Sequence, residues 1–149
     1  MDQSQACATD QQITATQIDG RTKGSFASSL FGSFFPMLLE PFIFGFADRL
    51  SPDYSGGNWN FYALSNGGFF MAPVHDSQFR VLSENGYQGE MSPEALGITA
   101  TLYAYGQIAA RNQAANNEDG AEKYSEHYHL LYDYMVEHAE VGSIHAAID

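Results

Sequence analysis

The chain has 149 residues, of which 44% are hydrophobic and 14% aromatic, so it can bury one sizeable core but has little room for two. Its 18 acidic and 6 basic residues give a formal net charge of -12, which argues against direct binding to nucleic acid through a phosphate-neutralising patch. The high apolar content likewise argues against disorder over most of the chain.

Neither export nor a membrane span is predicted. The first residues are acidic, amidic and small, whereas a secretory signal begins with basic residues and an apolar run. The most apolar stretch, residues 34–50, is shorter than a span and is interrupted by Glu40, Pro41 and Asp48. Cys7 is the single cysteine, so no intramolecular disulfide can form. A cytoplasmic protein fits these features.

The first half of the chain predicts a polar leader followed by one helix. Residues 1–25 are rich in Gln, Thr, Asp and Ser with no sustained apolar period, so we expect a flexible leader, with a single folded domain over residues 26–149. Apolar residues then recur from Phe34 to Leu50 at the three-and-four spacing of a helix face. Pro41 is expected to start or kink this helix.

The middle of the chain predicts two β-hairpins. Aromatic residues at 59–64 and 69–72 flank the turn sequence Ser-Asn-Gly-Gly, in which Asn and Gly can supply positive φ angles. A second pair of strands at 78–82 and 87–91 surrounds Glu-Asn-Gly. Together these segments predict a small antiparallel meander of about four strands.

The last third of the chain predicts helices. Ser92 is placed as an N-cap before Pro93, and the helix that follows should run to about Arg111. A polar loop over residues 112–120 precedes another long helix, whose apolar side runs from Tyr124 to His138, and a short C-terminal piece. The predicted fold class is α+β, a single domain with three to four helices packed on the meander.

Acidic residues follow one face of the last long helix. At 100° per residue they fall within about 100° of one another and form a stripe about 33 Å long. The stripe carries roughly one carboxylate per 5 Å, against one phosphate per about 3.4 Å on a DNA strand. The stripe is either a solvated face or a docking face, and its members are Glu118, Asp119, Glu122, Glu126, Asp133, Glu137 and Glu140.

No motif predicts an enzyme or a cofactor. Glu126, His129 and Asp133 have a spacing that could place three metal ligands on one helix face, but no second Glu-x-x-His pair complements them. A metal-dependent enzyme built on these three residues is therefore the weakest alternative. The sequence also lacks a Gly-x-Ser-x-Gly elbow and phosphate-binding glycine spacings. We predict no catalytic, cofactor-binding or metal-binding residues.

Three central blocks carry a family resemblance. Residues 53–62 read Asp-Tyr-Ser-Gly-Gly-Asn-Trp-Asn-Phe-Tyr, residues 64–73 read Leu-Ser-Asn-Gly-Gly-Phe-Phe-Met-Ala-Pro, and residues 85–92 read Asn-Gly-Tyr-Gln-Gly-Glu-Met-Ser. With these blocks the chain resembles the ArdB/KlcA antirestriction family over roughly residues 34–149. The resemblance implies a bacterial cytoplasmic protein of plasmids or other mobile elements that relieves type I restriction of incoming unmodified DNA, with no catalytic residues and no cofactor.

Two mechanisms remain open for such a protein. It could bind the type I restriction-modification enzyme or associated host proteins by protein-protein contact, or it could act as an acidic DNA mimic in the enzyme's DNA channel. Polar residues in predicted turns and acids of the stripe are the candidate partner-binding residues, because function is disproportionately found on loops and charged faces. They are Asp53, Tyr54, Asn66, Glu90, Glu122, Glu126 and Asp133. The oligomeric state is not predicted.

Overall fold

A computed structural model describes residues 12–149, which form five α-helices, one π-helical turn and five strands. In chain order the elements are β1 (Ala15–Gln17), α2 (Lys23–Phe31), the π-helical turn η1 (Phe35–Leu39), α3 (Glu40–Leu50), β2 (Trp59–Leu64), β3 (Phe69–Pro73), β4 (Phe79–Leu82), β5 (Gln88–Met91), α4 (Pro93–Ala114), α5 (Glu118–Met135) and α6 (Val141–Ile148). The α+β class and the two hairpins predicted from the sequence are confirmed.

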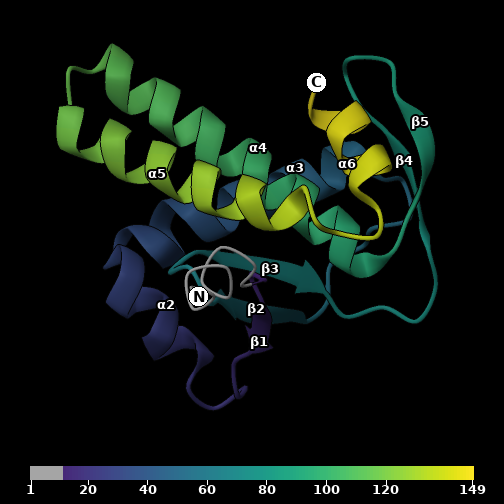
Figure 1. Ribbon diagram of the computed structural model, residues 1–149, viewed down its shortest axis with the longest axis horizontal. Coiled ribbons are helices and arrows are strands. Elements are labelled where there is room, and N and C mark those ends of the chain that lie inside the picture. The colour runs from purple at the N-terminus through teal and green to yellow at the C-terminus, as the bar shows by residue number, and fades with distance from the viewer. Residues whose placement is uncertain (1–11) are drawn as a thin grey trace, which may run out of the picture.

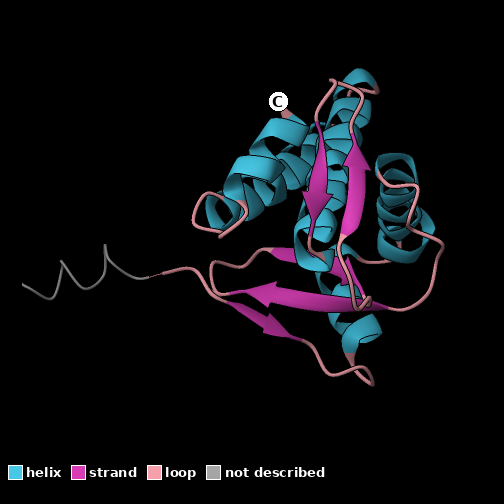
Figure 2. Ribbon diagram, turned by 90° about the vertical axis from the view of Figure 1, so that its right-hand side faces the viewer, coloured by secondary structure: helices cyan, strands magenta, loops and turns pink. Residues whose placement is uncertain are grey.

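The strands form two separate sheets, so the prediction of one meander is wrong. One sheet has the order β1-β2-β3 and the other pairs β4 with β5, and both are antiparallel. Figure 2 shows the two sheets running in different directions beside the helices. The connection from Val74 to Gln78 is exposed throughout, and it turns the chain away from β3 before β4 begins.

The central helix is α4, because it packs against both the sheet and the other helices. Its residues from Ala95 to Leu102 are all buried, so no face of this stretch reaches solvent. In Figure 1, α5 runs antiparallel along α4, while β1 to β3 lie below them and β4, β5 and α6 lie at one end. Gly97 brings α4 into close contact with β3, since a Cβ atom there would lie 2.3 Å from the Met71 carbonyl oxygen.

Part of the segment predicted as a flexible leader, residues 1–25, forms regular secondary structure. Residues 1–11, including Cys7, lie outside the described residues, but Ala15–Gln17 forms β1 and α2 begins at Lys23. The order of β1 comes from its partner strand, as Ala15 pairs with Leu64 and Gln17 with Tyr62. Two buried residues, Ala27 and Phe31, anchor α2 to the core. Two buried positions are too few to produce the apolar periodicity from which a helix is predicted.

The predicted helix over residues 34–50 is confirmed, with an irregular start. It opens with the π-helical turn η1, which runs directly into α3, and Pro41 lies in the first turn of α3. The missing N–H of Pro41 therefore coincides with the change from π-helical to α-helical hydrogen bonding. None of the helices in residues 12–149 is by itself both long and apolar enough to cross a membrane.

The C-terminal helices differ from the prediction at their ends. Ser92 caps α4 as predicted, accepting a hydrogen bond from the Ala95 N–H, but α4 continues to Ala114. The predicted loop over 112–120 shrinks to three residues, because Asn117 caps α5 by accepting from the Gly120 N–H. Residues 141–148, predicted as a short piece without assigned structure, form α6.

Candidate functional site

The motif loop, residues 51–58, is held in place by Asp53. Its carboxylate accepts hydrogen bonds from the Arg80 main-chain N–H (2.9 Å), from Nε (3.0 Å) and from Nη2 (2.6 Å). The hydrogen bonds from the Arg80 side chain, and more weakly the one from its main-chain N–H, lower the pKa of Asp53 to about 2. Asp53 therefore ties the loop after α3 to β4 and remains charged at neutral pH.

A second contact holds the other end of the motif loop. The Trp59 indole Nε1 donates to the Tyr54 hydroxyl at 3.1 Å, and the two rings meet edge to face with centroids 5.7 Å apart. Between these anchors, residues 55–58 are exposed, and Gly56 and Gly57 have φ angles of 93° and 105°, which favour glycine. The loop thus presents an exposed tip on a fixed base.

Asn66 lies beyond the opposite end of β2 from Asp53 and Tyr54. Its side-chain Nδ2 donates to the Leu130 carbonyl oxygen at 2.9 Å, and its Oδ1 accepts from the Gly68 N–H at 3.0 Å. Asn66 therefore shapes the β2–β3 turn and ties that turn to α5. The structure does not bring Asn66 together with the motif loop.

Glu90 is linked to the motif loop by Arg80, which pairs with Glu90 across the hairpin and bonds to Asp53. Glu90 is exposed on β5, directly opposite Arg80 of β4 in the strand register. The pKa of Arg80 is raised mainly by its hydrogen bond to Asp53 and more weakly by the negative charge of Glu90. Sequence reasoning missed Arg80, although an arginine opposite a glutamate on predicted strands was a usable signal.

The acidic stripe is shorter than predicted. Glu122, Glu126 and Asp133 are exposed on α5, as are Glu118 and Asp119, but α5 ends at Met135, before Glu137 and Glu140. Glu140 instead accepts hydrogen bonds from the Ser92 N–H (3.0 Å) and hydroxyl (2.5 Å). The longer stripe requires one continuous helix through residue 140, and the turn at 136–140 removes these two acids from it.

The three residues considered as metal ligands are surface residues of α5. Glu126, His129 and Asp133 are all exposed. Within residues 12–149, no group of three His, Cys, Asp or Glu side chains is arranged to hold a metal ion.

A half-buried ion pair between His138 and Glu94 joins the start of α4 to the turn after α5. His138 Nε2 lies 2.8 Å from Glu94 Oε2, and the Tyr134 hydroxyl donates to the same oxygen at 3.4 Å. The contact with His138 lowers the pKa of Glu94, and the contact with Glu94 raises the pKa of His138 against the opposing effect of burial. The pair secures the packing of α5 and α6 on α4.

The Glu94–His138 pair predicts a pH-dependent loss of stability in Glu94→Gln. The lowered Glu94 pKa adds stability that is present above about pH 4.5, and the raised His138 pKa adds stability that is present below about pH 6.5 and is lost above it. Urea unfolding at pH 5.5 should therefore show a loss of about 1 kcal/mol relative to the parent, with a smaller loss at pH 8.5. Equal losses at both pH values would contradict the ion pair.

Comparisons with known proteins identify relatives of this chain. A family model described as antirestriction protein matches residues 52–149. The antirestriction protein KlcA of Escherichia coli is 41% identical over 140 residues, covering 92% of this chain and 94% of that protein. The putative antirestriction protein YubI of Escherichia coli strain K12 is 30% identical over 129 residues, covering 84% of this chain and 88% of that protein.

A solved structure has the same fold. It is described as showing that the KlcA and ArdB proteins have a novel fold and antirestriction activity against type I DNA restriction systems in vivo but not in vitro. The likeness has a TM-score of 0.85 and a sequence identity of 36%, and it covers 93% of this chain and 96% of that chain.

Proposed function

This chain belongs to the antirestriction protein family, as its central motif blocks indicate, and from that premise we propose that it relieves type I restriction of incoming unmodified DNA in the cell. The observation that carries the proposal is the likeness, over nearly the whole chain, to a structure whose proteins have this activity in vivo. The proposed setting is the bacterial cytoplasm and a plasmid or other mobile element.

The proposed mechanism is protein-protein contact with the restriction enzyme or with associated host proteins. Activity of the related proteins in vivo but not in vitro supports a step that needs a cellular component. A protein that simply occupied the DNA channel of the enzyme would inhibit the purified enzyme as well. No catalytic step and no cofactor enter this mechanism.

The face formed by the motif loop and the β4–β5 hairpin supports such a contact. Asp53 and Tyr54 hold the loop, and Glu90 lies beside the Arg80 side chain on the same face. Because a rigid base reduces the ordering cost of association, an exposed tip on fixed anchors suits partner binding. Asn66 contributes by fixing the β2–β3 turn against α5.

The DNA-mimic mechanism is the second candidate, favoured by the exposed acids of α5. From Glu118 to Asp133 the stripe spans about 22 Å, at 1.5 Å per residue. Its five acids give roughly one charge per 5 Å of helix, whereas duplex DNA carries one charge per about 1.7 Å. The charge density on α5 is therefore well below that of the ligand it would imitate.

Plating of unmodified phage on cells with an active type I system tests the proposed function. Cells that express this protein should raise the plating efficiency by at least about tenfold over cells with an empty vector. The triple variant Glu122→Lys, Glu126→Lys and Asp133→Lys should keep this effect, because the stripe is a solvated face in the protein-contact mechanism.

Two outcomes would change this conclusion. Absence of relief by the folded parent protein would refute antirestriction activity for this chain. Loss of relief in the folded triple variant would instead support the electrostatic mechanism. A matched variant with three exposed acids off α5 and outside the helical groove, Asp19→Lys, Asp76→Lys and Glu137→Lys, controls for the change in net charge.

A further inference from the structure

A continuous groove crosses the face where α3, α4, α5 and α6 meet. Three adjoining hollows share residues: Gln107 lines the first and second, and Phe46 and Arg49 line the second and third. The two larger hollows have cavity volumes of about 270 and 320 Å³. We call this surface the aromatic–arginine groove.

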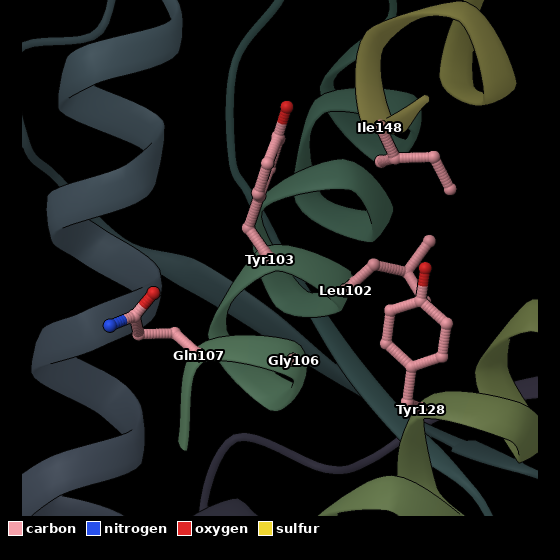
Figure 3. Close-up of a pocket in the computed structure, with 6 residues that line it drawn as sticks. All are labelled: Leu102, Tyr103, Gly106, Gln107, Tyr128 and Ile148. Carbon is pink, nitrogen blue, oxygen red and sulfur yellow. The ribbon is translucent and has the colours of Figure 1, made fainter. Parts of the chain in front are cut away.

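Aromatic side chains form much of the groove. Figure 3 shows Tyr103 and Gln107 projecting from α4, with Tyr128 of α5 and Ile148 of α6 on the other side of the hollow. The Tyr103 ring stacks on Phe46 of α3, with centroids 5.3 Å apart and an interplanar angle of 17°. The groove therefore offers flat apolar surface held by packing between helices.

Two of the six cationic residues of this acidic chain line the groove. The Arg49 guanidinium lies 5.2 Å from the Phe46 ring centroid, and the Arg111 guanidinium lies 5.3 Å from that of Phe42. Within residues 12–149, no carboxylate lies within 4.0 Å of Arg111. Arg49 has a long contact of 3.8 Å to Glu84, and both side chains are well exposed, at 62% and 86%.

Two glycines in the groove are not required by the packing of the fold. Gly45 in α3 and Gly106 in α4 are exposed in helix interiors, where glycine is less favourable than alanine. A Cβ atom would meet nothing within 4 Å at Gly45 and only an ordinary contact at 3.8 Å at Gly106. Missing side chains at these positions leave room for close approach by a molecule outside the chain.

We propose that the aromatic–arginine groove binds a segment of a partner protein that carries carboxylate side chains beside apolar ones. A guanidinium stacked on a ring keeps its N–H groups available for a bidentate carboxylate contact, and the rings receive the apolar side chains. The net charge of -12 disfavours a continuous polyanion such as DNA or RNA, so a polypeptide with separated acids is the occupant. This inference deepens the proposed function and rests on it for the identity of the partner.

Binding of a defined probe tests the groove directly. A capped peptide that repeats Glu-Leu-Leu-Glu is titrated into the full-length labelled protein, and amide NMR shifts of Gly45, Gly106 and Gln107 are followed. These amides should shift in a saturable way. The double variant Arg49→Gln/Arg111→Gln should bind about tenfold more weakly or worse, because two charged contacts are lost.

Matched variants separate binding from folding. Arg21→Gln removes a well-exposed cation from the turn before α2 and should bind the peptide as the parent does. Gly45→Leu places a good helix former in open space, so the helix content should be unchanged while the bulky side chain obstructs the groove and weakens binding. A peptide with Lys in place of Glu, and an oligothymidylate, should cause no shifts at the groove.

The outcomes separate failure of the peptide-binding proposal from failure of the proposed antirestriction function. Absence of saturable shifts, equal binding by the double variant, or tighter binding of the oligothymidylate would overturn the groove proposal. The folded double variant should also fail to relieve restriction in cells, and full relief by it would overturn the role of the groove while leaving antirestriction intact. Peptide binding by a parent protein that gives no relief would refute the proposed function and retain the binding site.

Discussion

Truncating Phe31 to alanine is expected to lower the free energy of unfolding by about 3–5 kcal/mol, which is a large part of the stability of a domain this size. Phe31 is 2% exposed and packs against Phe69, Tyr124 and His127, with ring centroids 5.7, 5.9 and 4.7 Å away. The substitution removes the main anchor of α2 and leaves a cavity between α2 and α5.

Phe34 supplies the matched control for Phe31. It lies three residues further along the chain and is 59% exposed, so Phe34→Ala should change the free energy of unfolding by no more than about 0.5 kcal/mol. Urea unfolding followed by tryptophan fluorescence measures both variants. Similar values for the two substitutions would show that α2 does not anchor in the core as described.

Gly97→Val is expected to lower the free energy of unfolding by about 3 kcal/mol. The Cβ atom would lie 2.3 Å from the Met71 carbonyl oxygen and 2.5 Å from the Ala72 Cα. Both are main-chain atoms of β3, which is hydrogen-bonded to β2 and cannot rotate away as a side chain would. Either α4 must move away from β3 or the buried contact between them must be lost.

Gly106→Ala provides the comparison in the same helix. Because the added methyl would meet Tyr128 at an ordinary 3.8 Å, the gain in helix propensity should stabilise the protein by roughly 0.5–1 kcal/mol. Thermal unfolding of the two variants should therefore move in opposite directions. A neutral Gly97→Val substitution would contradict the close approach of α4 to β3.

The elements that sequence patterns predicted well are those with strong local signals. The turn glycines and aromatic runs located β2 and β3, and Ser92 with Pro93 located the start of α4. These features depend on residues a few positions apart. The family resemblance rests on the same central blocks, and the comparisons confirm it.

The elements that were missed depend on contacts between distant residues. β1 is polar and gains its order from pairing with β2, while α2 has only two fully buried side chains. The separation of the two sheets follows from how the exposed connection at 74–78 directs the chain, which no local pattern encodes. Helix ends at 112–120 were also misplaced, since the cap at Asn117 was not recognised.

The candidate site likewise combines features set by local sequence with features set by contacts between distant residues. The positions of Asp53 and Glu90 in turns and strands could be predicted, and the hairpin register was a signal for Arg80 opposite Glu90. The bond from Arg80 to Asp53 could not be predicted, because the two residues are 27 positions apart in different elements. Glu140 appeared to belong to the acidic stripe and instead binds Ser92, 48 residues away. The aromatic–arginine groove draws on four helices and has no continuous sequence motif.

Parallel assays in cells and with purified enzyme test whether this protein relieves type I restriction through contact with proteins, as we propose, and not by replacing DNA. We expect higher plating of unmodified phage in expressing cells, with no inhibition of DNA cleavage by the purified type I enzyme at any ratio of this protein to DNA. Inhibition of the purified enzyme that is relieved by added DNA and by salt would contradict the protein-contact mechanism and establish DNA mimicry.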